Sequence, residues 1–519
     1  MSKVDMSSEN SGKDFATSSS QGGEILEINN DDEVLHNLGY EQHMKRGFNF
    51  WSMTAFCLTG LGLLPSLGGT LWFSLGYLGL MPMTWGWLVA SFFIMFEVLS
   101  LAEMSSAMPT SGGLTFRCAP VRIRKLASYV TAWCMMASAS LGGASFYMTQ
   151  ANMIQALVVM FNADFSPNEA YVYLIYLACV ILCAVVMALP TKILGWISTV
   201  FVWMSTITFF IILIALPIYC RKTGNYNTAH DIFFTEYNQT EWSSKGLVFL
   251  LTFLVPYDFG SQVGLAHLAE ETEDAANVVP RVMWISCLTV AVLGYVFNVV
   301  LAFAATDIDA IFESPLGQPL GAILVLAMGN GSLTKLLWIC TVLSNFGVVF
   351  VCNAAATRIY FAYARDGALP CAKWLSHVNR TTRTPVNATI ALSTVFALIG
   401  LISLGSTTAL QAFFSGSSVS GAIAYLMPVL MRCINENNPD YKPGPFNLGK
   451  WSRPVRLVAC MWTIFTLPLF SFPDSPNPDA TTFNWSIAFN GGLFLIVLPW
   501  YFFKARKTFH GPGAKDLSH

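Results

Sequence analysis

The chain has 519 residues, of which 54% are hydrophobic and 11% are charged. Soluble domains usually carry about 25% charged residues, so this composition excludes an ordinary soluble protein and indicates several membrane spans. The net charge of −2 argues against nucleic acid as a partner. The twelve cysteines lie mostly in apolar runs and lack ligand spacing, so we expect no disulfide framework, metal site or cofactor.

The two ends of the chain differ in composition from its middle. Residues 1–45 are rich in Ser, Asn, Asp and Glu, show no cleavable signal peptide, and predict a disordered cytoplasmic tail. A membrane domain is expected over residues 46–505, and residues 506–519 are expected to form a short cytoplasmic tail.

Long apolar segments recur along the membrane domain. A span needs about 20 mostly apolar residues. The chain offers twelve such segments: 48–75, 80–108, 127–155, 169–190, 193–219, 244–268, 280–305, 332–360, 386–404, 407–431, 456–472 and 483–503. Residues 310–330 contain Pro315, Gly317 and Pro319, and predict a loop with a short helix or a re-entrant piece.

Basic residues are distributed unequally between the two sets of loops. One set, together with both tails, carries 24 of the 28 lysines and arginines, and the other carries only four. Because basic residues accumulate on the cytoplasmic side, both termini are predicted to be cytoplasmic, which requires an even number of spans. Asn238 begins an Asn-Gln-Thr triplet in a predicted external loop, where an N-linked glycan is expected in a eukaryotic secretory pathway.

Two of the predicted spans are interrupted near their middles. Cys57–Pro65 in span 1 and Val255–Ser261 in span 6 place glycine and proline inside apolar segments. Glycine costs roughly 1 and proline roughly 3 kcal/mol in a helix interior, and freed backbone groups persist in a membrane only where they line a cavity. Paired interruptions in two halves indicate the binding site of a secondary transporter. We therefore predict an all-α membrane protein with twelve transmembrane helices: a five-plus-five inverted repeat with broken helices 1 and 6, plus two additional helices.

Four further stretches occur in a fixed order relative to the spans. They are Ala102–Gly113 at the end of span 2, His267–Arg281 after the span 6 break, Asn353–Pro370 at the end of span 8 and Arg383–Ala388 before span 9. Together they resemble the amino acid–polyamine–organocation superfamily, and within it the fungal branch of GABA permeases and choline transporters. The resemblance extends from about residue 45 to residue 505.

This resemblance implies that the interrupted part of span 1 holds a substrate carboxylate or an equivalent polar group. N–H groups at the positive end of a half-helix suit an anion. The matching positions are Thr59, Gly60, Leu61 and Gly62.

In span 6, the superfamily commonly sets an aromatic gate over the ligand, and Tyr257 occupies that position. Its ring suits an ammonium group by cation–π attraction, although an interfacial or core tyrosine is the alternative. Many fungal members have an Asp seven residues before the Glu-Glu pair, where this chain has Val263; it carries Asp258 instead. We expect Asp258 to meet the substrate amine or take the driving proton, unless freed span 6 amides satisfy it. Gly260 and Ser261 complete this side of the expected site.

Glu97, near the middle of span 2, is the second intramembrane acid. Burial favours the protonated form of a carboxyl group, which suits a proton carrier, but a hydrogen-bonded residue of the bundle is the alternative. Glu103 belongs to the resemblance and is expected to be structural. Asn345 and Asn353 on span 8 are either helix–helix contacts or cavity lining. Span 5 lacks the central lysine of some proton-coupled relatives, so proton coupling by that route is not expected.

Charged residues gather at the predicted cytoplasmic mouth. Glu270 and Glu271 follow span 6 with Arg281 nearby. A similar collar after span 8 consists of Arg358, Arg365 and Asp366. We expect Glu270, Glu271 and Asp366 to form and break ion pairs during gating, with ordinary solvated loop charges as the alternative. The solvated loop is the preferred interpretation for Thr272, Glu273 and Asp274.

The leading hypothesis is a secondary active transporter in the lipid bilayer that imports a small amine-bearing solute. The resemblance implies an amino acid or GABA as solute and the proton as driving ion, with choline or another organic cation as the alternative. No His/Asp pair or phosphate-binding glycine loop favours a membrane-embedded enzyme, no filter or charged ring favours a channel, and no ATP-binding motif appears. We expect a plasma-membrane location, with the endoplasmic reticulum, Golgi or vacuole as alternatives.

Overall fold

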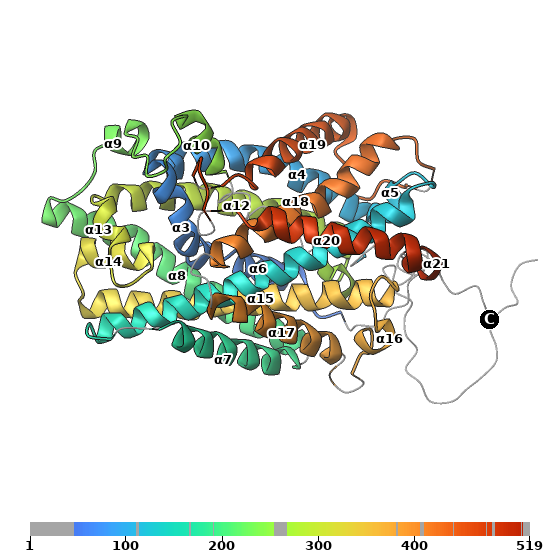
Figure 1. Cartoon of the computed structure of the whole chain (residues 1–519), viewed down its shortest axis with the longest axis horizontal. Helices are drawn as coiled ribbons and strands as arrows, with labels where there is room; N and C mark the ends of the chain where they lie inside the picture. Colours follow the sequence, from blue (N-terminus) through green and yellow to red (C-terminus); the bar gives the residue numbers. More distant parts are fainter. Residues whose placement is uncertain are drawn as a thin grey trace, which may run out of the picture.

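The computed structural model describes residues 46–110, 114–165, 168–189, 191–253, 267–379, 382, 384–404, 409–439, 441–473, 475–479, 483–509 and 511. These residues form an α-helical bundle in which many of the long helices run along one common direction (Figure 1). Within the described ranges there is no β-strand, and one isolated parallel bridge joins Phe48 to Thr272. The all-α prediction is confirmed for this part of the chain.

Five predicted spans make up the first half of the bundle. Span 1 comprises α2 (Phe50–Leu61) and α3 (Pro65–Leu78), and span 2 comprises a π-helical turn η1 (Pro82–Gly86) that continues into α4 (Trp87–Ala107). Next come the short α5 (Leu114–Cys118), then α6 (Arg124–Phe161), α7 (Glu169–Met187) and α8 (Thr191–Thr223).

Local capping explains where two of these helices begin. The Asn49 side chain accepts the N–H of Ser52 at 2.9 Å, and the Ser52 hydroxyl accepts the Asn49 N–H at 2.9 Å, which is a capping box at the start of α2. Asn168 likewise accepts the Tyr171 N–H at 2.8 Å at the start of α7.

The second half follows the same order. The short α9 (Ala229–Phe234) precedes α10 (Lys245–Leu251), which begins span 6. Spans 7 to 10 correspond to α12 (Ala275–Ala304), α15 (Ser332–Arg365), α17 (Val386–Gly400) with a 3-10 turn η3 (Leu401–Leu404), and α18 (Ala409–Ile434); α16 (Ala372–Leu375) lies between α15 and α17. The last two predicted spans are α19 (Ser452–Leu469), after η4 (Gly449–Trp451), and α20 (Ser486–Trp500), which continues through η5 (Tyr501–Ala505) into α21 (Arg506–Thr508).

Residues 310–330 contain more helix than the predicted loop with one short helix. α13 (Ile308–Phe312) is capped by Asp307, whose carboxylate accepts the Ala310 N–H at 3.0 Å, and α14 (Pro319–Met328) starts on a proline at its first position. α14 packs on α3 and α8, and its Leu320, Ile323 and Leu324 are fully buried. The prolines that suggested a loop therefore separate two helices.

Among the described residues, eight helices are long and apolar enough to cross a membrane by length and composition: α2 with α3, η1 with α4, α7, most of α8, α12, α15, most of α18, and α20 with its extension. The remaining predicted spans fall short for identifiable reasons. α6 has 38 residues but is rich in Ser, Thr and Gln, α17 has 15 residues, α19 contains Arg453 and Arg456, and much of span 6 lies outside the described residues. The total of twelve spans stays a prediction.

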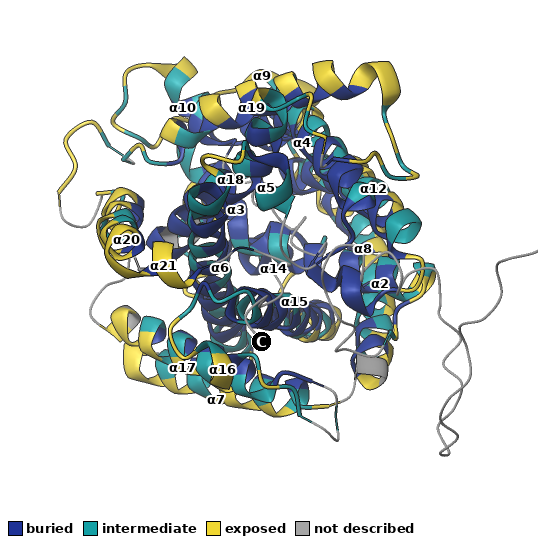
Figure 2. Cartoon of the chain, turned by 90° about the vertical axis from the view of Figure 1, so that its right-hand side faces the viewer, coloured by how far each residue is buried: buried dark blue, intermediate teal, exposed yellow. Residues whose placement is uncertain are grey.

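Burial separates the inner helices from the outer ones. In Figure 2, which looks along the bundle, the interior is buried while the outward faces of α7 and α20 are exposed. These exposed faces are apolar: Leu174, Ile181 and Val185 on α7, and Leu495 and Ile496 on α20, are all more than half exposed. Apolar side chains on the outside of a helical bundle are suited to contact with lipid. The protein is a multi-pass membrane protein.

The inner part of the bundle is formed by α2, α6, α15 and α18, which are largely buried, while α4 and α12 are partly exposed. α6 packs along both α18 and α15, α4 packs along α12, and α2 lies against α8, α12 and α15. The interrupted span 1 is therefore surrounded by other helices, which is where broken helical backbone is tolerated in a membrane protein.

Candidate functional site

The helix of span 1 is interrupted at Gly62. α2 ends at Leu61, and Gly62 adopts left-handed backbone angles (φ 55°, ψ 51°) while its N–H donates to the Leu58 carbonyl at 3.2 Å. Helix resumes at Pro65, which stands at the first position of α3 and has no N–H to leave unpaired. The interruption predicted over Cys57–Pro65 is thus confirmed in its position.

Two glycines allow the interrupted segment to lie against α15. A Cβ atom at Gly60 would lie 2.7 Å from Val351 Cγ1, and one at Gly62 would overlap Val348 and Ser66. Gly62 also needs its positive φ, which L side chains rarely adopt. Residues with side chains would push α2 away from α15 at this point.

The polar groups of the interruption differ from the expectation in one respect. Thr59, Gly60 and Leu61 lie inside the last turn of α2, where helical hydrogen bonds use their N–H groups. The Thr59 hydroxyl is buried and within donor distance of the carbonyls of Ala55 (2.8 Å) and Ser198 (3.1 Å), so it ties α2 to α8. The positive end that could face an anion is therefore the start of α3, just after Gly62.

Span 6 is described only at its beginning. α10 ends at Leu251, far short of a membrane-spanning length, and packs against α3. Residues 254–266 lie outside the described residues. The predicted site residues in that range are Tyr257, Asp258, Gly260 and Ser261.

Two buried ion pairs join the end of span 6 to α15. Arg358 Nε lies 2.7 Å from Glu271 Oε1, and Arg365 Nη1 lies 2.8 Å from Glu270 Oε2. Each guanidinium makes a second contact, 3.4 Å for Arg358 Nη2 with Glu271 Oε2 and 3.0 Å for Arg365 Nη2 with Glu270 Oε1. Two-point contacts of this kind fix both distance and orientation. Asp366 is further away, with its Oδ1 3.8 Å from Arg365 Nε.

These contacts and the burial of the loop decide between the alternatives for its charged residues. Glu270 and Glu271 pair with arginines of α15, and Arg281, which lies near them in the sequence, is exposed. The solvated-loop interpretation is wrong for both glutamates and for Thr272, because all three are buried. It holds for Glu273 and Asp274, which are exposed. The difference arises because the loop after span 6 folds inward against α15.

The chain just before span 1 docks on the same loop. The N–H groups of Gly47 and Phe48 both donate to the Glu271 carbonyl (2.9 and 3.1 Å), and the Glu273 N–H donates to the Phe48 carbonyl (2.9 Å). The Phe48 ring is 1% exposed and packs edge-on against Phe56 of α2, with ring centroids 5.2 Å apart. The start of span 1 and the end of span 6 are therefore held together, a contact that the sequence did not indicate.

Two acids of α4 are buried against α19. The Thr463 hydroxyl lies 3.3 Å from Glu97 Oε2 and can donate to it. Nearer the C-terminal end of α4, a Glu103 carboxylate oxygen accepts a hydrogen bond from the Ser452 hydroxyl at 2.6 Å and lies 3.6 Å from an Arg456 nitrogen. The expected structural role of Glu103 agrees with this geometry, and Glu97 lies where a helix-bundle hydrogen bond is available.

The two asparagines of span 8 connect α15 to neighbouring helices. Asn345 Nδ2 donates to Gln150 Oε1 of α6 at 2.8 Å, and Asn353 Nδ2 donates to the Tyr147 hydroxyl of the same helix at 2.8 Å. Both asparagines therefore act as helix–helix contacts. Among the described residues, no group of three or more His, Cys, Asp or Glu side chains is placed to hold a metal ion.

Asn238 lies on an exposed segment between α9 and α10. Its carboxamide oxygen accepts the N–H of Thr240 at 2.9 Å and the hydroxyl of Thr240 at 2.7 Å, so the triplet forms a local turn.

We expect a protein expressed in a eukaryotic secretory pathway to carry one N-linked glycan at Asn238, because the predicted orientation exposes this loop to the lumen and then to the outside. Glycosidase treatment should increase the electrophoretic mobility of the native chain by one glycan more than that of Asn238→Gln, because Asn330 and Asn484 also begin Asn-X-Ser triplets on the predicted external side. Exposed Asn447, which lacks the triplet, provides the matched control as Asn447→Gln. A native chain that is insensitive to the glycosidase would contradict the predicted orientation.

Comparison with known proteins agrees with this arrangement. The sequence profile described as amino acid permease matches residues 48–498. An uncharacterized amino-acid permease of Schizosaccharomyces pombe is 33% identical, with 99% of this chain and 93% of the relative covered. A putative polyamine transporter of Candida albicans is 29% identical, covering 93% and 89%, and the GABA-specific permease of Saccharomyces cerevisiae is 27% identical, covering 94% and 86%. With a matching profile over most of its length and relatives that are transporters, not enzymes, the chain belongs to the amino acid permease family.

Proposed function

We propose that this permease imports a small amine-bearing solute by alternating access, with an amino acid or an ω-amino acid such as GABA as substrate. The observation that carries the proposal is the interruption of span 1 at Gly62, inside the bundle, where the following helix α3 packs on α10 at the start of span 6. An interrupted helix inside the bundle presents backbone N–H and C=O groups to a solute. Regular helices cannot do so, because they use these groups in their own hydrogen bonds.

The proposed site combines both interrupted spans. The start of α3, next to Thr59, Gly60, Leu61 and Gly62, would face the carboxylate of the substrate. Tyr257 and Asp258, with Gly260 and Ser261, would face its ammonium group. The names of two relatives, a GABA-specific permease and a putative polyamine transporter, support an amine as the common feature of the substrate. Choline or another organic cation is the second candidate.

Helix contacts support the proposed five-plus-five inverted repeat. In such a repeat, spans 3, 4 and 5 correspond to spans 8, 9 and 10. A contact between span 3 and span 10 should therefore be matched by one between span 8 and span 5, and a contact between spans 3 and 4 by one between spans 8 and 9. α6 packs on α18, and its counterpart α15 packs on α8; α6 also packs on α7, and α15 packs on α17. These reciprocal contacts support twelve spans in which ten are related by symmetry.

Closure of the cytoplasmic side is assigned to the buried ion pairs. Glu270 and Glu271 follow span 6, Arg358 and Arg365 belong to α15, and Asp366 lies beside Arg365. Opening toward the cytoplasm requires the pairs to separate. A buried charge without its partner is costly in free energy, so water has to reach both charges as they separate. The proton is proposed as the driving ion, with Asp258 and Glu97 as the candidate carriers.

An uptake panel with reconstituted protein tests the proposal. GABA, neutral and basic amino acids, choline and polyamines are offered as radiolabelled solutes at two external pH values, with and without sodium. Saturable and concentrative uptake of an amine is expected, faster at the lower external pH and unaffected by sodium. Absence of uptake for every amine would overturn the proposed function, and a sodium requirement would overturn the proton.

Replacing Asp258 by asparagine is expected to reduce uptake of the amine substrate by roughly tenfold or more, since loss of about 1.4 kcal/mol of interaction changes affinity tenfold. If Asp258 takes the driving proton, the remaining uptake should also lose its dependence on external pH, because asparagine cannot be protonated in this range. The measurement is initial uptake rate against pH. Asp164→Asn, at an exposed acid between α6 and α7, is the matched control. An unchanged rate and pH profile in Asp258→Asn would remove both proposed roles.

A further inference from the structure

A cavity of about 400 Å³ opens at the end of span 1 that is remote from the ion pairs. α2 begins beside the loop that carries Glu271, so the other end of span 1 lies across the bundle, near α9, α10 and α13 (Figure 1). The residues that determine its chemistry are Trp72, Phe73 and Tyr77 of α3, Phe312 of α13, Glu241 before α10 and Asp479 after α19.

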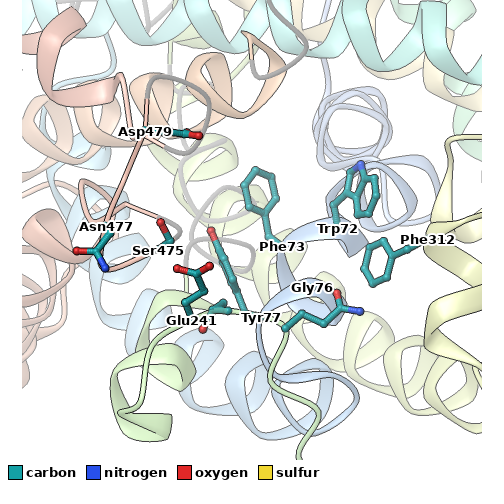
Figure 3. Close-up of a pocket in the computed structure, with 11 residues that line it drawn as sticks. Trp72, Phe73, Gly76, Tyr77, Glu241, Phe312, Ser475, Asn477 and Asp479 are labelled. Carbon is teal, nitrogen blue, oxygen red and sulfur yellow. The ribbon is translucent and has the colours of Figure 1, made fainter.

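The cavity combines aromatic faces with carboxylates. Trp72 and Phe312 stack with ring centroids 4.4 Å apart and an angle of 13° between their planes. Figure 3 shows the Glu241 carboxylate beside the Tyr77 ring, and Phe73 between Trp72 and the loop that carries Asp479. Aromatic rings attract cations through their faces, and nearby carboxylates add charge attraction. No lysine or arginine lines this cavity in the part of the chain that the structure describes.

Hydrogen bonds hold the loops that form the cavity wall. The Tyr237 hydroxyl donates to Asp309 Oδ1 at 2.6 Å, and the Tyr237 N–H donates to the Leu78 carbonyl at 3.2 Å. Trp242 Nε1 donates to the Pro473 carbonyl at 3.3 Å. The segment that carries Glu241 is thereby tied to α3, to α13 and to the loop after α19. The hydrogen bond to Asp309 also raises the pKa of the Tyr237 hydroxyl, which therefore stays a neutral donor.

Charge over the whole face has the same sign as the cavity. The predicted external loops and helix ends carry ten acidic residues against four basic ones, whereas 24 basic residues lie on the opposite side. A mouth of negative potential concentrates cations and can raise their association rates by roughly 10-fold or more. The same field disfavours solutes that are purely anionic.

We propose that this cavity is an outer binding site for the ammonium group of an organic cation, separate from the central site at the interrupted spans. Trp72 follows Gly62 by ten residues, which corresponds to about 15 Å along a helix. The outer site therefore engages the solute before it reaches the interruption. The inference rests on the proposed transport of amines for its physiological role, but binding of a cation is measurable without transport.

A cysteine placed in the cavity tests the site directly. Gly76 is half-buried, and a Cβ atom there would meet only Phe312 Cζ at 3.6 Å and Gln239 Oε1 at 4.0 Å, which are ordinary contacts. Of the twelve native cysteines, all within the described ranges, Cys371 alone is exposed, and it lies on the predicted cytoplasmic side. Membrane-impermeant reagents applied to intact cells should therefore report on Gly76→Cys with little background. Ser475→Cys, nearly isosteric, is the second reporter position if the first variant does not reach the surface.

The readout is the ratio of labelling rates for two methanethiosulfonates, one carrying a trimethylammonium group and one a sulfonate. We expect the cationic reagent to react faster, and the ratio to fall roughly fivefold when Glu241→Gln and Asp479→Asn are added, because both carboxylates attract the cation and repel the sulfonate across a screened aqueous cavity. Asp164→Asn, on the same face but outside the cavity, should leave the ratio unchanged.

Protection provides the second measurement. Choline should slow labelling of Gly76→Cys, whereas its neutral isostere dimethylbutanol at the same concentration should not. A cysteine that is not labelled from outside, a ratio that survives loss of both carboxylates, or equal protection by the two compounds would overturn the outer site. Amine uptake without protection would leave the proposed function standing and refute the site; protection without uptake of any amine would refute the function and leave the site standing.

Discussion

Replacing Arg358 by methionine is expected to destabilise the protein by about 3–5 kcal/mol and to abolish uptake, because the variant leaves Glu271 as a buried charge without its partner. The side chains of Arg358 and Glu271 are 2% and 1% exposed, so water cannot take over the role of the guanidinium. Methionine fills much of the space and leaves charge as the main difference. The measurement is the thermal unfolding midpoint of the solubilised protein, together with uptake in vesicles.

The double variant Arg358→Met with Glu271→Gln separates a gate from a structural contact. Removing both charges of a buried pair is often neutral or stabilising, so stability should return to near the native level. If the pair must open and close during transport, uptake should stay impaired, since the closed state is then held by different forces. Recovery of both stability and uptake would contradict the gating role.

Arg281→Gln is the matched control for this series. Arg281 lies close to the glutamates in sequence but is exposed, so its loss should change stability by no more than about 0.5 kcal/mol. A single variant at Arg358 that is as stable as Arg281→Gln would contradict the burial of the pair.

The sequence predicted the helices well where local chemistry decides them. Glycines and Pro65 marked the interruption of span 1, and the structure ends α2 at Leu61 and restarts helix at Pro65. The start of α7 at Glu169 follows from the Asn168 cap. These features depend on backbone angles and hydrogen bonds within a few residues, which a sequence displays directly.

Side-chain partners were not predictable in the same way. Arg358 and Glu271 are 87 residues apart, and nothing local indicates that the loop after span 6 folds inward to meet α15. Arg281 was the nearer basic residue in sequence and proved to be exposed. The docking of Phe48 on Thr272 also depends on two distant segments that meet only in the folded bundle. Partners of this kind are decided by tertiary packing, and a single sequence does not show which distant residues lie close together in the fold.

The polarity of α6 is explained only by its neighbours. The sequence predicts a span over 127–155, but the Ser, Thr and Gln residues of this helix make it a weak candidate by composition. The structure places it against α15 and α18, where Gln150 and Tyr147 bond to asparagines of α15. A central helix of a membrane bundle can carry these residues because neighbouring helices, not lipid, surround it.

Replacing Gly62 by alanine is expected to lower uptake by roughly tenfold or more, since a cost of about 1.4 kcal/mol already corresponds to a factor of ten. Left-handed backbone costs a residue with a Cβ about 1–2 kcal/mol, and Gly62 has a φ of 55°. The added methyl group would also overlap Val348 of α15 and the Ser66 hydroxyl, and such overpacking typically costs about 1–3 kcal/mol. The substitution should therefore shift α3 relative to α2 at the place where the substrate is proposed to bind. Initial uptake rate and apparent substrate affinity are the measurements.

A companion substitution separates the backbone effect from the steric one. Gly62→Ala combined with Val348→Ala removes the overlap with α15 but keeps the strained φ, so recovery should be partial. Gly246→Ala is the control, because Gly246 lies in α10 with no atom within 4 Å of an added Cβ, and alanine there should leave uptake intact. Full recovery in the double variant would mean that only the close approach to α15 matters. Native uptake in Gly62→Ala itself would mean that the interruption of span 1 plays no part in binding.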